Sequence, residues 1–173
     1  MKTKLLWSAV LLLVIWAMKR YYSRAGADDL WWILSPTAHL AGGTAVSFVA
    51  EPGAGYLSRE RLFLIGKPCA GLNFMIAAFA MLAFILRRRV TSVTSGAAVL
   101  AGSLLTAWSA TLIVNATRIA IAMWLMAHPF ALSRLTAAQS HRVEGIIVYF
   151  TGLLLLHELV LRVQGGALSL PRR

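Results

Sequence analysis

The chain has 173 residues, of which 59% are apolar and only 13% are charged, and its mean hydropathy is +0.72. A soluble domain carries roughly a quarter of its residues as charged side chains, so this composition excludes an ordinary soluble globular protein and predicts an integral membrane protein. The 17 Lys and Arg residues exceed the 6 Asp and Glu residues and give a formal net charge of +11. Because the basic residues lie between apolar segments and are not interleaved with aromatic residues, they indicate loops at a membrane surface and exclude a nucleic-acid interface.

The first apolar segment runs for 14 residues from Leu5 to Met18. Two interpretations are open for it. A signal peptide would be cleaved among the small residues at 23–27, whereas an uncleaved helix would be anchored by the basic and aromatic residues at 19–22. The direct succession of the apolar run and this anchor favours the uncleaved helix.

The next segment, Leu30 to Ala50, has 21 residues and is long enough to span the hydrocarbon of a bilayer. It contains a proline, a histidine and two adjacent glycines. These residues predict a spanning helix that packs inside a bundle, where small residues allow close approach. The polar residues from Glu51 to Pro68 predict a loop with a short interfacial helix.

Three later segments are long enough to span the membrane, namely Cys69–Leu86, Gly96–Val114 and Val143–Leu161. Ile119–Leu132 is also apolar but has only 14 residues, which rise about 21 Å as a helix against about 30 Å of hydrocarbon. We therefore expect this segment to be short or re-entrant.

The predicted fold class is all-α, because no segment shows the ten-residue alternation of a transmembrane β-barrel. We expect a polytopic transmembrane helix bundle with about five or six membrane helices, one of them short or re-entrant. The chain is expected to be one integral membrane domain. Its expected parts are amino-terminal helices and a loop at 1–68, a core at 69–161 and a basic tail at 162–173.

Charge predicts the orientation of this bundle. The cluster Arg87–Arg89 is expected in the cytoplasm by the positive-inside rule, which places Cys69 at the outer end of the same helix. The following span returns outward and brings Arg118 to that face, and the last span begins outside near His141. If 119–132 does not cross the membrane, the three side chains converge at the extracytoplasmic face of the inner (cytoplasmic) membrane.

Cys69 is the one cysteine of the chain, so no intramolecular disulfide can form. It follows Pro68, which is typical of a helix start, where backbone N–H groups and the helix dipole favour a thiolate. The alternative is a small buried apolar residue, which is the common role of a free cysteine.

Two other polar residues are candidates for chemistry. Arg118 lies between apolar segments, where a guanidinium faces either a cavity or a polar partner, or extends to the lipid head groups. Asn115 precedes it by three residues, on the same helical face, and is expected to orient it. His141 is either a residue of a surface loop or a base that takes the proton of a thiol and returns it to a leaving amine. No pattern of metal ligands is present, so neither a metal nor another cofactor is expected.

The residues Pro68-Cys69-Ala70-Gly71-Leu72 are the first of three segments that resemble the signature blocks of the exosortase/archaeosortase family. The other two are 115–119 (NATRI) and 141–145 (HRVEG). The blocks of this family carry a Cys followed by a small residue and Gly, then Asn-x-x-Arg, then His-x-x-x-Gly, in the same order and at similar spacing. In length the chain is similar to the compact type called exosortase K.

The resemblance implies a membrane-embedded cysteine protease and transpeptidase. Its substrates would be exported proteins whose carboxy-terminal sorting tail consists of a short PEP-CTERM-like motif, a transmembrane helix and a basic cluster. It implies that Cys69 forms an acyl-enzyme, that His141 acts as base and acid, and that Arg118 stabilises the thiolate or the oxyanion. Asn115, Asn73 and Glu144 are expected to support these groups.

The expected partners are therefore such exported proteins and the lipid bilayer. The oligomeric state stays open, as does the acceptor of the acyl group, which is water, a lipid amine or a glycan precursor. The alternatives are an inactive relative and a non-enzymatic membrane assembly subunit whose polar residues only tie helices together. A transporter would place its polar residues near the midplane instead, and the motifs of other intramembrane hydrolases are missing from the sequence.

Overall fold

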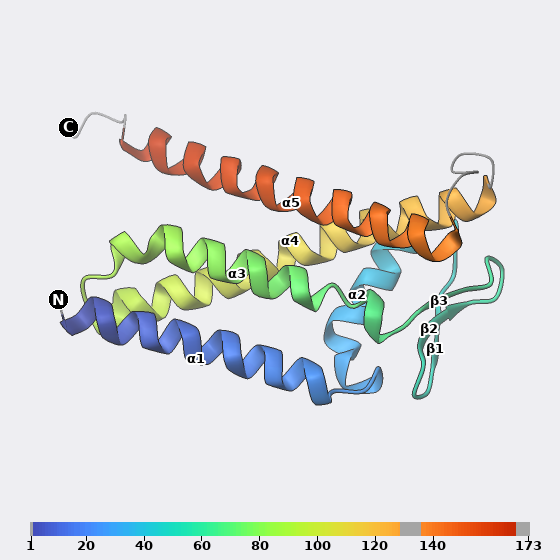
Figure 1. Ribbon diagram of the computed structural model, residues 1–173, viewed down its shortest axis with the longest axis horizontal. Helices are drawn as coiled ribbons and strands as arrows, with labels where there is room; N and C mark the ends of the chain where they lie inside the picture. The colour runs from blue at the N-terminus through green and yellow to red at the C-terminus, as the bar shows by residue number, and fades with distance from the viewer. Residues whose placement is uncertain (1, 129–135, 169–173) are drawn as a thin grey trace.

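The computed structural model describes residues 2–128 and 136–168, and it is mostly helical (Figure 1). Its α-helices are α1 (Lys2–Arg24), α2 (Trp31–Gly42), α3 (Leu72–Leu86), α4 (Val93–Ala127) and α5 (Ala137–Leu168). Three short 3-10 helices are η1 (Asp28–Leu30), η2 (Lys67–Cys69) and η3 (Arg87–Arg89). The strands are β1 (Val49–Glu51), β2 (Gly55–Ser58) and β3 (Phe63–Ile65), which form an antiparallel sheet in the order β1-β2-β3.

The sheet corrects the all-α prediction, since it occupies the region that the sequence indicated to be a loop with a short helix. The proline and glycines there form the turn of a hairpin: Ala54 N–H donates to Glu51 O at 3.0 Å, and Gly53 has a φ of 75°. Both oxygens of the Asp28 carboxylate accept the Gly53 N–H at 3.0 Å, which ties the turn to η1. Proline and glycine occur at the turns between strands as well as in loops, so they did not distinguish the two. The strands are also too short to show a clear alternation of apolar and polar residues.

Three helices among the described residues are long and apolar enough to cross a membrane. They comprise Lys67–Arg89, which includes α3, then α4, and Arg142–Gln164 within α5. The expected helix at Leu5–Met18 is present within α1. The expected span at Leu30–Ala50 is wrong, because α2 ends at Gly42 and the chain turns at Gly43, whose φ of 54° suits glycine. Five or six spans are therefore not confirmed within residues 2–128 and 136–168.

Helix α4 is continuous for 35 residues. The predicted end of a span near Val114 is thus wrong. The segment from Ile119 to Ala127 is also not a separate short or re-entrant helix, because it continues α4. Residues 129–132 of the predicted segment lie outside the described residues. A helix of this length rises about 52 Å, well beyond about 30 Å of hydrocarbon. Because α4 extends past the apolar layer, the chain needs no re-entrant segment to bring the ends of α3, α4 and α5 together.

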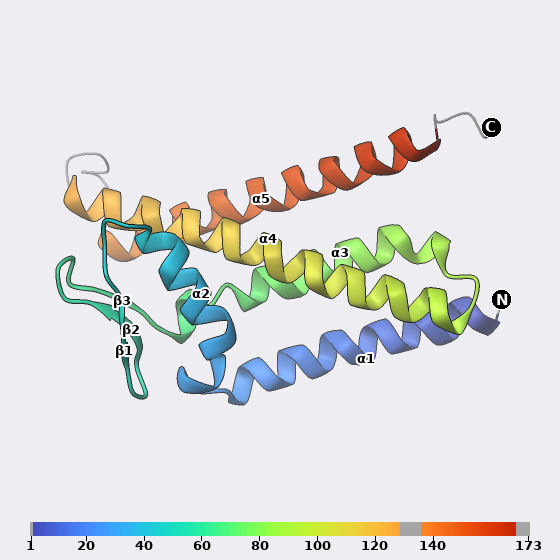
Figure 2. The same cartoon turned by 180° about the vertical axis from the view of Figure 1, so that it is seen from behind.

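The elements divide the molecule into two ends (Figures 1 and 2). The start of α1, the connection between α3 and α4 with Arg87–Arg89, and the last turns of α5 lie at one end. The sheet, η2, the end of α4 and the start of α5 lie at the other, with α2 beside them. The connection at 66–71 and the first residues of α5 therefore lie at the same end as the sheet. We call this end the sheet end.

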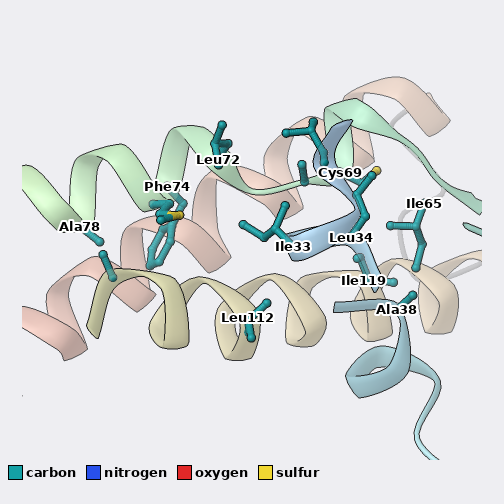
Figure 3. Close-up of a cluster of buried hydrophobic side chains, with 14 of the residues drawn as sticks. Ile33, Leu34, Ala38, Ile65, Cys69, Leu72, Phe74, Ala78, Leu112 and Ile119 are labelled. Carbon is teal, nitrogen blue, oxygen red and sulfur yellow. The ribbon is translucent and has the colours of Figure 1, made fainter. Parts of the chain in front are cut away.

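The apolar core lies between α2, α3 and α4 (Figure 3). Leu34 of α2, Ile65 of β3 and Ile119 of α4 are fully or almost fully buried there, and Cys69 belongs to the same cluster. By contrast, only 6% of the apolar window of α5 is buried inside the protein. Helix α5 thus turns most of its apolar surface outward, as expected of a helix that faces lipid.

Two glycines set the contact between α5 and its neighbours. A Cβ at Gly152 would lie 2.9 Å from both methyl groups of Val114, and a Cβ at Gly145 would lie 3.0 Å from Nε of Arg118. The two glycines are seven residues apart and so lie on one face of α5. Close packing of this kind through small residues is a main source of helix association in membranes, where apolar burial alone gives little preference.

We predict that Gly152→Leu destabilises the contact between α4 and α5 by about 1–3 kcal/mol, since it places a large side chain against Val114. The measurement is reversible unfolding of the purified protein in mixed micelles. Gly102→Leu is the matched control, because a Cβ at Gly102 of α4 meets no atom within 4 Å. Equal destabilisation by both variants would contradict the proposed packing.

Candidate active site

Cys69 is held by a tight turn between the sheet and α3. Strand β3 ends at Ile65, and after Gly66 the chain forms η2, whose last residue is Cys69. The Cys69 N–H donates to Gly66 O at 2.8 Å. Helix α3 begins only at Leu72, so the thiol precedes the helix by one short turn and is not part of its first turn.

Gly71 explains why the first sequence block contains a glycine after the cysteine. Its φ is 69°, a left-handed conformation that favours glycine. A Cβ there would also lie 3.0 Å from Cγ of Asn115 and 3.1 Å from Cγ2 of Thr111. The absence of a side chain therefore lets the cysteine turn approach α4 closely.

A chain of hydrogen bonds links the cysteine turn to α4 and α5. The Asn115 Nδ2 donates to the backbone oxygen of Cys69 at 2.6 Å, and the Tyr149 hydroxyl donates to Asn115 Oδ1 at 2.7 Å. The same hydroxyl accepts from a terminal nitrogen of Arg118 at 3.2 Å. Asn115, which the sequence predicted to orient Arg118, is linked to it through the Tyr149 hydroxyl.

Arg118 is buried and paired. It is 6% exposed, and its Nε lies 3.8 Å from Oε2 of Glu144, which is 7% exposed. Its guanidinium also lies 5.2 Å from the centre of the Tyr149 ring. This burial excludes the alternative in which Arg118 extends to the lipid head groups, because such a side chain would be exposed at its tip.

The thiol belongs to the same electrostatic group. Cys69 is 9% exposed, and it lies close enough to Arg118 and to the Glu144 carboxylate for electrostatic interaction with both. The site therefore combines a thiol, a guanidinium, a carboxylate and a phenol in a largely buried environment. Such a group can stabilise negative charge on sulfur or on an oxygen that forms next to it, since charge interactions are stronger where water is excluded.

The other residues expected at the site differ in their placement. His141 lies in the first turns of α5, at the sheet end, but its side chain lies outside the described residues. Asn73 does not join the group: it is exposed, and its Oδ1 accepts from Nζ of Lys19 in α1 at 2.8 Å. It sits one helical position past Leu72, which faces the core, and therefore points to another side of α3.

Tyr149 is the residue that the sequence reasoning missed. It contacts Arg118 and Asn115 as described, and its ring packs on Phe74 with 5.3 Å between the ring centres. A signal was present, since Tyr149 follows Gly145 by four residues and therefore lies on the same face of α5 as the third sequence block. A tyrosine is common in an apolar segment, so its presence alone does not indicate that its hydroxyl forms hydrogen bonds at a site.

The structure thus joins all three sequence blocks in one group of contacts through Cys69, Asn115, Arg118 and Glu144. Comparisons of the chain with protein-family models, with curated proteins and with solved structures found no match.

We predict that Asn115 and Tyr149 are energetically coupled. A double-mutant cycle with Asn115→Ala and Tyr149→Phe, measured by unfolding in mixed micelles, should give a coupling free energy of about 0.6 kcal/mol, the average for interhelical hydrogen bonds in a membrane protein, and no more than about 1.7 kcal/mol. The control cycle pairs Asn73→Ala with Tyr149→Phe and should be additive, because Asn73 bonds to Lys19 instead. Additivity in both cycles would show that the hydrogen bond does not contribute to stability.

Proposed function

We propose that this protein is a membrane-embedded cysteine peptidase and transpeptidase of the exosortase type, which cleaves the carboxy-terminal sorting tail of exported proteins. The observation that carries the proposal is that Cys69 and Arg118 are both buried and are joined through the hydrogen bonds of Asn115 and Tyr149. These two residues belong to separate sequence blocks and are 49 positions apart, yet they meet with Asn115 and Glu144 at one end of the bundle. A buried arginine beside a cysteine has a chemical use in acyl transfer that it lacks in an apolar core.

The reaction begins with attack of the Cys69 sulfur on a peptide carbonyl of the tail. The carbonyl oxygen gains negative charge as the carbon–sulfur bond forms, and the Arg118 guanidinium stabilises this oxyanion. Removal of one such donor typically lowers the rate by about 10²–10³. Glu144 and Tyr149 hold the guanidinium from two sides, and Asn115 fixes the backbone of the nucleophile.

His141 supplies the proton transfers in this proposal. It accepts the thiol proton and then delivers it to the leaving amine as the peptide bond breaks, which leaves an acyl group on Cys69. Water or an amine then attacks the acyl carbonyl and gives a proton to the imidazole. The carbon–sulfur bond breaks, the acid or amide product leaves, and the imidazolium returns the proton to the Cys69 thiolate. His141 precedes Glu144 and Gly145 by three and four residues, and these residues contact Arg118, so position 141 lies on the face of α5 that meets the site.

The proposed orientation places the sheet end outside the cell and the compact basic cluster Arg87–Arg89 in the cytoplasm, where the positive-inside rule puts such a cluster in a short connection. The protein would then be a multi-pass protein of the inner membrane, and its site would meet substrates after export. We include α1 as a fourth membrane helix. It has 23 residues, which rise about 34 Å, and it runs beside α3 and α4 (Figures 1 and 2).

A non-enzymatic assembly subunit is the competing function, because the same hydrogen bonds would also tie three helices together. That function requires the packing of Arg118 and Asn115 but not the reactivity of the thiol. The two functions are therefore separated by substitutions that keep the packing and remove the chemistry.

We predict that Cys69→Ala abolishes processing of an exported reporter that ends in a tripartite sorting tail. The two proteins are co-expressed, and the size of the reporter is followed on a gel. Cys69→Ala removes only the sulfur, so the variant should reach the same abundance in the membrane, which is checked in parallel. Processing that persists in this variant would exclude a cysteine acyl-enzyme, and a native protein that processes none of several tails from the same genome would support the assembly subunit.

We predict further that charge-conserving and size-conserving substitutions discriminate site residues from residues of the same type elsewhere. Arg118→Lys and His141→Gln should each lower the processing rate by about 10²-fold or more. Arg162→Lys and His157→Gln are the matched controls, since Arg162 is exposed and paired with Glu158 far from the sheet end, and His157 lies in the same part of α5. Equal loss in the control variants would attribute the effect to general damage of α5 or of surface charge.

A further inference from the structure

We infer that the free edge of strand β3 binds the recognition segment of the substrate as an added β-strand and delivers its carbonyl to Cys69. This inference rests on the proposed function and names how that site recognises its substrate. It assigns a role to the sheet, which the proposed chemistry does not use.

Strand β3 has one free edge, because it pairs only with β2. Its carbonyl at Ile65 faces β2, since a Cβ at Gly55 would collide with the Ile65 oxygen. In an antiparallel pair the N–H and C=O of one residue point to the same side, and this side alternates along the strand. Leu64 stands opposite Leu57 in the register, so its N–H and C=O point away from β2, to the free edge.

Leu64 lies on the exposed face of the sheet, and its main chain is not used in the ladder to β2. Leu64 is 46% exposed, whereas Phe63 and Ile65 on either side are 9% and 0% exposed and belong to the apolar core. Among the hydrogen bonds of the loops, turns and caps of residues 2–128 and 136–168, none uses the main chain of Leu64. The strand therefore presents a rigid backbone with one donor and one acceptor directed outward.

The position of β3 distinguishes it from the other edge of the sheet. Ile65 is followed by Gly66 and then by the turn whose hydrogen bond from Cys69 N–H to Gly66 O holds the thiol. Strand β1 lies two strands away, a separation of about 10 Å. A peptide on β3 would therefore lie beside the strand that leads into the cysteine turn, whereas a peptide on β1 would be displaced from that strand by the width of the sheet.

The chemistry of the substrate supplies the reason for such a strand. A peptide bond inside a helix has its carbonyl hydrogen-bonded and its carbon shielded, so the segment that Cys69 attacks must be extended. At a membrane surface the backbone groups of an extended segment need partners, because unsatisfied groups are costly where water is scarce. Addition to a sheet edge provides these partners and tolerates varied side chains. The occupant is therefore the extended segment on the amino-terminal side of the substrate's membrane helix.

The first test removes the outward donor. Leu64→Pro eliminates the Leu64 N–H without breaking the ladder to β2, because proline is tolerated at a sheet edge. Processing of the tailed reporter should fall at least tenfold. Ala50→Pro is the matched control. Ala50 of β1 stands opposite Tyr56 of β2, and the alternation of backbone directions along an antiparallel strand points its N–H to the other free edge of the sheet. Unchanged processing in Leu64→Pro, or an equal fall in Ala50→Pro, would overturn the inference.

The second test does not depend on catalysis. Because Cys69 is the only cysteine of the chain, a Cys69→Ala background carrying Leu64→Cys has a single thiol. A reporter with one cysteine in its recognition segment should form a disulfide with position 64 under mild oxidation, since facing residues of neighbouring strands lie within disulfide range. The Ala50→Cys protein in the same background should not. A crosslink at 50 and not at 64, or crosslinks between two copies of the protein in place of the reporter, would overturn the inference.

The outcomes separate this inference from the proposed function. If the native protein processes the reporter and Cys69→Ala does not, the proposed function stands whatever the behaviour of Leu64→Pro. If the native protein processes no tail, the proposed function fails, and with it the role of β3. If processing requires Cys69 but is equally fast in Leu64→Pro, only the β3 inference fails.

Discussion

The buried charge of Arg118 is the constraint on which the rest of the structure depends. A guanidinium inside an apolar bundle is tolerated only where partners compensate for its lost hydration. These partners come from α5, which contributes Glu144 and Tyr149, while Asn115 connects the same group to the cysteine turn. One charge thereby fixes the rotation of α5 about its axis and the position of the turn that carries the thiol.

Glycine makes these contacts geometrically possible. Gly145 and Gly152 let α5 approach α4 at the levels of Arg118 and Val114, and Gly71 lets the cysteine turn approach Asn115. A side chain at any of these positions would separate the elements that the polar contacts join. Packing and polarity therefore act on the same few residues, which explains why glycine occurs in two of the three sequence blocks beside the polar residues.

The prediction from sequence succeeded where the signal is local and erred where it depends on distant contacts. The helices α3, α4 and α5 and their common end could be predicted, because hydrophobic length and charge are properties of consecutive residues. The segment after Arg118 has the length of a half-helix, yet it continues α4. The charge of Arg118 is compensated by buried partners, so the helix does not have to end where this charge occurs. The contacts of Asn73 with Lys19 and of Tyr149 with Asn115 could not be read from the sequence, because each joins helices that are far apart in the chain.

The sequence by itself determined that this protein belongs to the membrane and which segments are apolar enough to cross it. It also showed that Cys69, Arg118 and His141 adjoin such segments. Hydropathy and charge decide these features, and both can be read residue by residue. Only the tertiary structure decided that Leu30–Ala50 does not form one span, that a sheet leads into Cys69, and that a tyrosine links Arg118 to Asn115. Each of these depends on contacts between residues far apart in the chain. Hydrogen bonds of that kind cannot be inferred from the composition of one segment.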